Sequence, residues 1–159
     1  MSSDLALALS AFGIGIVAGL RSMTAPAVVS WAAHLHRLDL RDSRLALLGS
    51  SIAVFTISAL GLGELIADKL PFVPNRTSPL PMALRILSGA ICGAALCVSA
   101  DRLILEGTLL GALGASNGAV TGFHVRRLLV KYLKIKDTAI ALAEDAIAIG
   151  AGLFLVSRF

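Results

Sequence analysis

Charged residues are scarce in this chain. Only 15% of its 159 residues are Asp, Glu, Lys or Arg, whereas a soluble domain carries about 25%. Hydrophobic residues make up 57%, and the mean hydropathy is +0.86. The shortage of charge argues against an ordinary soluble domain and favours an integral membrane protein. The length predicts a single membrane domain over residues 1–159.

Aromatic residues are also few, at 5% of the chain. The formal net charge of +4 and the pI near 9.6 would by themselves suit a nucleic-acid partner. The basic residues, however, lie in short segments between apolar runs, and no aromatic-rich polar surface is present for bases to stack on. We therefore expect no nucleic-acid partner, and we interpret the positive charge as anchoring to membrane lipids.

The residue patterns of common enzymes and metal sites are missing too. Cys92 and Cys97 lie five apart within one apolar run, which indicates core residues rather than a disulfide or a metal pair. We find no Glu-x-x-His pair, no glycine-rich phosphate loop and no Ser/His/Asp or Cys/His arrangement. We therefore expect no enzymatic activity, no catalytic residue, no cofactor and no metal site.

Long apolar segments are what the sequence does contain. About 20 residues at about 1.5 Å each cross a hydrocarbon core about 30 Å thick. The first residues lack the positive charge of a secretory signal, so the first apolar run is interpreted as a retained span. The sequence predicts an all-α, multi-pass membrane bundle of about five helices, over Leu5–Leu20, Leu45–Ala67, Met82–Ala100, Leu103–Phe123 and Thr138–Val156.

The first of these segments is interrupted. Apolar character resumes after Arg21 and continues to Leu35, which is too long for one untilted span. In one interpretation, the helix breaks and a half-helix follows over about Ala27–His36, capped by Thr24 with Pro26 in its first turn. In the other, a single tilted helix is kinked at Pro26. The sequence leaves both open.

Acidic residues lie inside two of the predicted spans. Glu144 and Asp145 are adjacent in the middle of the last span, where insertion of one carboxylate costs about 2.5–3.5 kcal/mol. Glu64 and Asp68 lie four apart at the end of the second span. Such groups normally face a protein interior or a wet cavity. They therefore indicate where the protein acts, or where it is held together.

Two functions fit these charges. The first is a transporter- or channel-like protein for an unknown small solute or ion, with a polar site of Arg21, Thr24, Glu64, Asp68, Arg76, Glu144 and Asp145. The second is a non-transporting scaffold or lipid-binding protein, in which arginines such as Arg21, Arg76 and Arg85 neutralise the carboxylates. Carboxylates within about 4 Å of an arginine, without a cavity reaching either face, would favour the second. An open polar vestibule would favour the first.

Glycines form a stripe along the fourth span at spacings of three and four, which allows neighbouring helices to approach closely. This packing occurs within the chain or between copies, and we expect a homodimer through glycine-lined faces. The stripe consists of Gly107, Gly111, Gly114, Gly118 and Gly122.

Two parts of the chain resemble each other. Ala59–Glu64 and Ala139–Glu144 alternate small and large apolar residues before a glutamate, and spaced glycines precede each by one span. They suggest an inverted repeat of spans one and two with spans four and five. The distribution of basic loops favours a cytoplasmic N-terminus and an external C-terminus.

Four motifs carry a resemblance to a known family. They are Gly19–Pro26, Glu64–Pro71, Pro74–Thr77 and Glu144–Asp145. Together they resemble the bacterial membrane proteins grouped as domain of unknown function 4126, in matching order over most of the chain. The resemblance implies a small multi-pass protein of the bacterial inner membrane, and it implies no activity. It highlights Arg21, Thr24, Pro26, Glu64, Asp68, Pro71, Pro74, Arg76, Glu144 and Asp145.

Overall fold

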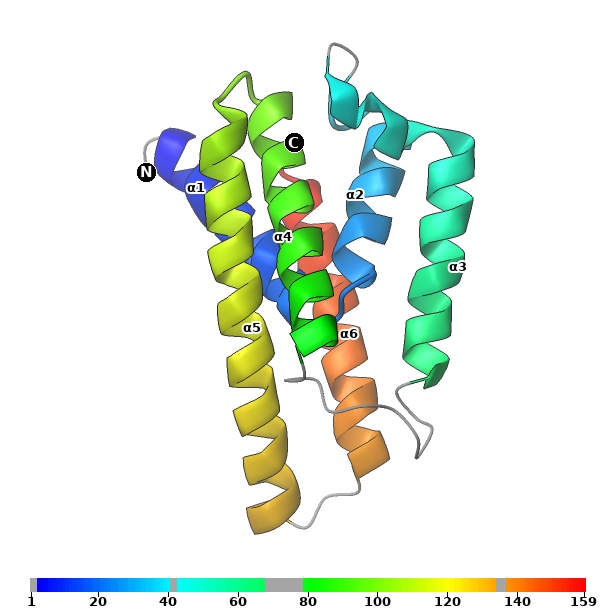
Figure 1. Ribbon diagram of the computed structural model, residues 1–159, viewed down its shortest axis with the longest axis vertical. Helices are drawn as coiled ribbons and strands as arrows, with labels where there is room; N and C mark the ends of the chain where they lie inside the picture. Colours follow the sequence, from blue (N-terminus) through cyan, green and yellow to red (C-terminus); the bar gives the residue numbers. More distant parts are fainter. Residues whose placement is uncertain (1–2, 41–42, 68–78, 134–136) are drawn as a thin grey trace.

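The computed structural model describes residues 3–40, 43–67, 79–133 and 137–159. Within these ranges the chain forms six α-helices and one 3₁₀ helix and contains no strand (Figure 1). The all-α prediction is therefore confirmed. The elements are α1 (Ser3–Leu20), α2 (Thr24–His34), the 3₁₀ helix η1 (Arg44–Gly49), α3 (Ser51–Ala67), α4 (Pro79–Ser99), α5 (Ile104–Leu133) and α6 (Asp137–Val156).

The first apolar run is broken, as one of the two interpretations predicted. α1 ends at Leu20 and α2 begins at Thr24, three residues earlier than the expected half-helix. Pro26 lies in the first turn of α2, where its missing N–H is tolerated. The predicted capping role of Thr24 is wrong, because Met23 is the N-cap residue and its side chain makes no capping hydrogen bond. The N–H groups before α2 have another acceptor, described below.

The break also reverses the direction of the chain. α2 runs back towards the end of the bundle where α1 began, and α3, α4, α5 and α6 then alternate in direction (Figure 1). The start of α1 and the end of α6 consequently lie at the same end. There Asp4 forms an ion pair with Arg102, and both line a pocket with Arg158. The prediction that the termini lie on opposite sides is therefore wrong, because hydropathy alone does not show that α1 and α2 form a hairpin.

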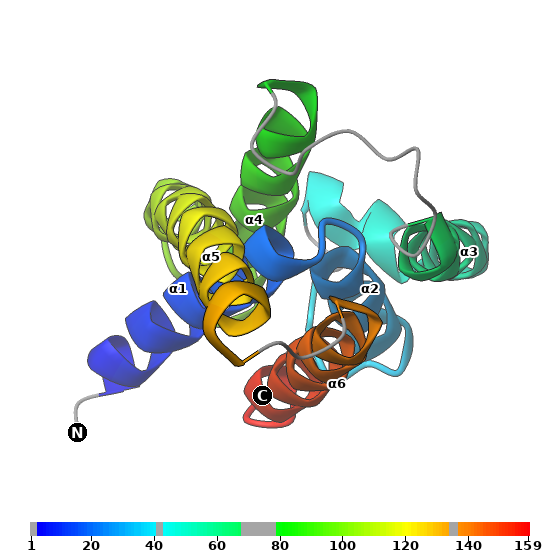
Figure 2. The same cartoon turned by 90° about the horizontal axis from the view of Figure 1, so that it is seen from below.

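The glycine stripe of α5 packs within the chain. A Cβ atom at Gly107 or Gly111 would come under 3.0 Å from the backbone of α4, and one at Gly114 or Gly118 would do the same against α1. Figure 2 shows α5 lying over α1 and beside α4, with α3 on the other side of the molecule next to α2. The packing prediction is confirmed for these glycines. Because these faces are occupied inside one chain, a homodimer would need another surface, and dimerisation itself stays a prediction.

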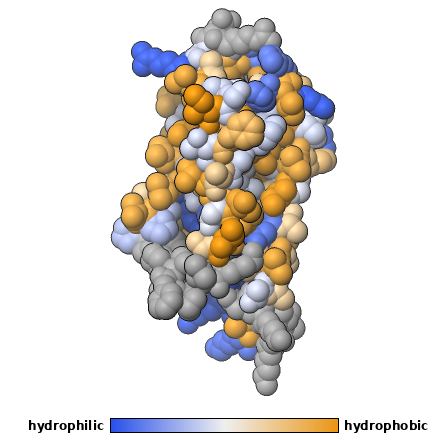
Figure 3. Space-filling model, turned by 90° about the vertical axis from the view of Figure 1, so that its right-hand side faces the viewer, coloured by the Kyte–Doolittle hydropathy of each residue, from blue (hydrophilic) through white to orange (hydrophobic). Residues whose placement is uncertain are grey.

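The outer surface is largely apolar. Large hydrophobic side chains are exposed on several helices, among them Ile52 and Phe55 of α3 and Leu153 of α6. Hydrophobic residues cover much of the middle of the face seen in Figure 3. Two helical segments, Pro79–Ser99 and Thr138–Val156, are long and apolar enough to cross a membrane, and Asp4–Leu20 and Ser51–Ala67 are shorter apolar helices.

Candidate functional site

Charged side chains from three helices converge on the break between α1 and α2. Arg21 belongs to the break itself, Glu64 comes from the last turn of α3, and Arg85 lies in the second turn of α4. Asp145, from the middle of α6, reaches the same region. We call these four residues the break cluster. The sequence analysis grouped Arg21, Glu64 and Asp145 in one polar site and named Arg85 among the arginines that could neutralise it.

Glu64 receives the N–H groups that precede α2. Its Oε1 accepts hydrogen bonds from the backbone N of Ser22 at 2.9 Å and from the Ser22 hydroxyl at 2.7 Å. Its Oε2 accepts from the backbone N of Met23 at 2.8 Å. A carboxylate at this place also interacts favourably with the positive end of the α2 dipole. Glu64 therefore caps α2 from a different helix.

Arg85 performs the complementary role at the end of α1. Its Nη1 donates hydrogen bonds to the carbonyl oxygens of Gly19, at 2.5 Å, and Leu20, at 2.7 Å. A cation is favourable there because the carbonyl end of a helix carries partial negative charge. Its Nη2 lies 3.8 Å from Oε1 of Glu64. One ion pair thus supplies hydrogen-bond partners to both helix ends at the break.

Arg21 and Asp145 form a deeply buried ion pair. Nη2 of Arg21 lies 2.5 Å from Oδ1 of Asp145, and the Arg21 side chain is 0% exposed. The backbone N of Arg21 still donates to the carbonyl of Val17, so Arg21 continues the hydrogen bonding of α1 by one residue. The pair fixes the middle of α6 against the end of α1.

Glu144 has a different partner from its neighbour. Consecutive helical residues point about 100° apart, and Oε2 of Glu144 lies 3.5 Å from Nη1 of Arg126 on α5. A Cβ at Gly122 would lie 3.2 Å from Oε1 of Glu144, so this glycine leaves room for the carboxylate. α5 continues beyond the predicted span end at Phe123 to Leu133, and on this extension Arg126 turns towards Glu144 and is only 17% exposed.

The remaining predicted site residues lie elsewhere. Thr24 is buried and lines an apolar groove of about 270 Å³ with Trp31 and Ser58. Asp68 and Arg76 lie outside the described residues. Arg85 was absent from the predicted site and was named only among the arginines that could neutralise the carboxylates. Its position as a lone arginine within the apolar span Met82–Ala100 is the feature of the sequence that indicates a buried role.

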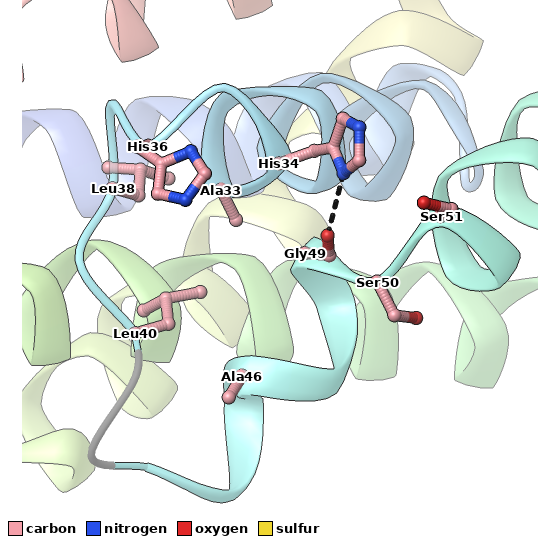
Figure 4. Close-up of a pocket in the computed structure, with 9 residues that line it drawn as sticks. All are labelled: Ala33, His34, His36, Leu38, Leu40, Ala46, Gly49, Ser50 and Ser51. Atoms are coloured by element: carbon pink, nitrogen blue, oxygen red, sulfur yellow. Dashed lines mark hydrogen bonds between the residues drawn. The ribbon is translucent and has the colours of Figure 1, made fainter.

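A pocket of about 390 Å³ lies between the end of α2, η1 and the start of α3. His34 and His36 lie on either side of Ala33 there, and Nδ1 of His34 is 2.9 Å from the carbonyl oxygen of Gly49 (Figure 4). The two imidazoles therefore do not converge on one point. Among the described residues, no group of three or more His, Cys, Asp or Glu could hold a metal ion.

Comparison with known proteins identifies one family. A family model described as "Domain of unknown function (DUF4126)" matches residues 8–157. This match confirms the resemblance carried by the four sequence motifs. No curated protein and no solved structure matches the chain detectably.

Proposed function

This chain belongs to the family of domain of unknown function 4126, and we propose that it is a multi-pass membrane protein whose buried charges hold a hairpin of two helices in place. The description of the family names no activity, so the proposal rests on the geometry. One observation carries it. Each of the three described acidic residues of the predicted site lies within 4.0 Å of an arginine: Glu64 of Arg85, Glu144 of Arg126, and Asp145 of Arg21.

The location in a membrane is supported by the surface and by the helix lengths. α4 and most of α6 are apolar over a length sufficient to cross a bilayer, and their outer faces carry exposed leucines and isoleucines. The α1–α2 hairpin begins and ends at the same end of the bundle, as a re-entrant segment does (Figure 1). Non-helical backbone at membrane depth is tolerated when it is buried in protein, and Glu64 and Arg85 supply its hydrogen bonds.

The accessibility of the break cluster favours a structural role over transport. A bound solute would need a cavity that touches the cluster, yet Arg21 is 0% exposed and Asp145 is 7% exposed. Buried ion pairs of this kind give little net stability, but losing one member is costly. They therefore act by fixing the relative positions of α1, α2, α3, α4 and α6. The short arginine–carboxylate distances are what the sequence criterion expected of a scaffold or lipid-binding protein, and they support this proposal.

Transport remains the second candidate because of one observation. In transporters with broken helices, the N-terminal end of a half-helix binds an anionic group of the solute. In this chain the Glu64 carboxylate occupies that position before α2. A transport cycle would require Glu64 to leave and an anionic solute to replace it.

A thermal-shift screen of the purified protein distinguishes the two functions. A ligand that binds only the folded state at about 100 times its Kd adds about 2.7 kcal/mol, which corresponds to roughly 5–10 °C. We expect phospholipids to raise Tm by that order, and ions, amines and organic anions to leave it unchanged. A water-soluble anion that raises the Tm of the wild type, but not of Glu64→Gln, would contradict the structural role.

The arrangement of the helices also predicts the membrane topology. α5 ends and α6 begins at the end of the bundle opposite to the start of α1 and the end of α6 (Figure 1), and Arg127 and Lys131 are exposed near that end. A cytoplasmic N-terminus, as expected from the basic loops, would place this basic end of α5 outside the cell. By the positive-inside rule we propose instead that this end is cytoplasmic and that the start of α1 and the end of α6 are external.

Cysteine labelling tests this topology. Leu5, Ser157 and Tyr132 are exposed, whereas native Cys92 and Cys97 are buried. We expect a membrane-impermeant maleimide, added outside, to label Leu5→Cys and Ser157→Cys and to spare Tyr132→Cys. Labelling of Leu5→Cys and Ser157→Cys from opposite sides would refute the hairpin.

A further inference from the structure

An apolar groove lies between α1, α5 and α6, with a volume of about 270 Å³. Leu20 of α1, Val125 and Leu129 of α5, and Ile140 and Ile147 of α6 contribute to its walls. The Arg126–Glu144 ion pair also lines it. We call it the α5–α6 groove. The structural role of the break cluster does not account for it.

The groove exists because α5 and α6 are consecutive but barely touch. α5 packs mainly on α1 and α4, and α6 packs mainly on α1 and α2. Gly118 and Gly122 line the groove on the α5 side and add no side-chain volume. In a membrane, a crevice with such walls would be filled by the tail of an amphiphile.

Basic residues lie at one end of the groove. Arg126 belongs to its wall, and Arg127 and Lys131 are exposed on the turns of α5 that follow. Glu144 offsets one positive charge, so this end of α5 keeps a positive excess among its described residues. An anionic head group complements that excess, whereas a zwitterionic one gains less from it.

The length of α5 sets the depth of these residues. α5 has 30 residues, which corresponds to about 45 Å, and a hydrocarbon core is about 30 Å thick. If the core begins at Ile104, it ends near Phe123, and Arg126 lies one turn further, at head-group level. Gly118, eight residues before Arg126, lies about 12 Å deeper. The groove therefore runs from the head-group region into the hydrocarbon.

We propose that the α5–α6 groove binds an anionic phospholipid, with one acyl chain between α5 and α6 and the phosphate at Arg126, Arg127 and Lys131. This inference rests on the membrane location proposed above. The apolar groove lined by Thr24 and Trp31 serves as an internal comparison. It also measures about 270 Å³, and its described lining residues carry no charge.

Native mass spectrometry with added phosphatidylglycerol or phosphatidylcholine tests the site. Ala143 lines the groove and Ala146 does not, and both are exposed on α6. Ala143→Phe fills the groove without entering the core, and Ala146→Phe makes the same change outside it. We expect the wild type and Ala146→Phe to retain phosphatidylglycerol in preference to phosphatidylcholine, and Ala143→Phe to retain about tenfold less.

A double variant tests the charge. Arg127→Gln combined with Lys131→Gln removes two exposed charges and keeps the Arg126–Glu144 pair, so we expect a folded protein whose preference for phosphatidylglycerol falls severalfold. Equal retention of both lipids by the wild type would overturn the proposal, as would an unchanged retention in Ala143→Phe. Either result would leave the coupling of Arg21 with Asp145 untouched, so failure of this site is distinguishable from failure of the structural role.

Discussion

Asp145→Asn is expected to lower the free energy of unfolding by about 3–5 kcal/mol, since it removes the negative charge next to a buried cation. The Arg21 guanidinium lies 2.5 Å from Asp145 and is 0% exposed, so water cannot replace the lost carboxylate without a rearrangement of α1 and α6. Asparagine keeps the volume of aspartate, which leaves charge as the principal change. Equilibrium unfolding in mixed micelles measures the effect.

The adjacent residue provides a matched control. Glu144→Gln removes the same charge one position earlier, but its partner Arg126 is 17% exposed and can turn towards water. We expect a loss of about 1 kcal/mol, as for a partly exposed pair. Equal losses in the two variants would show that burial of Arg21 does not determine the cost.

Gly111→Ala is expected to lower the free energy of unfolding by about 2–3 kcal/mol through overpacking. A Cβ atom at Gly111 would come under 3.0 Å from the backbone of Gly89, so α4 and α5 would have to separate. Because the carbonyl of Gly111 also faces Gly15, the contact between α5 and α1 would shift as well. Thermal unfolding of the purified variant measures the loss.

Gly63 and Gly150 are the controls for this substitution. A Cβ at either position would meet nothing within 4 Å. Alanine has the higher helix propensity, by about 0.5–1 kcal/mol, so Gly63→Ala and Gly150→Ala should be neutral or stabilising. If Gly111→Ala is equally harmless, the close contact between α4 and α5 is absent in the membrane.

The interruption near Arg21 and the glycine packing could be predicted from the sequence because each depends on local chemistry, although a break and a kink both fitted the interruption. An arginine with Thr-Ala-Pro three residues later interrupts an apolar run, and glycines at spacings of three and four mark a face that another helix approaches. The hairpin could not be predicted in this way. Hydropathy records the length of a segment but not its direction, so the reversal at Arg21 and the shared end of the two termini were missed. The inverted repeat stays a prediction.

The assignment of the buried charges to a substrate or ion site stays a prediction, and the sequence left their pairings open. Arg21, Glu64, Glu144 and Asp145 were selected because charge in an apolar run is costly, and they are the residues that form the buried pairs. Which arginine meets which carboxylate depends on the three-dimensional packing of α3, α4, α5 and α6. The cap of α2 was missed for the same reason. The acceptor is Glu64, which lies about 40 residues away in the sequence, and not the neighbouring Thr24.

A double-mutant cycle on Arg21 and Asp145 tests the central claim most directly. The free energies of unfolding are measured for the wild type, Arg21→Met, Asp145→Asn and the double variant. A structural ion pair predicts that the double variant is at least about 2 kcal/mol more stable than the sum of the single losses implies. Strictly additive losses would mean that the two side chains do not interact, and they would contradict the structural role proposed for the buried charges.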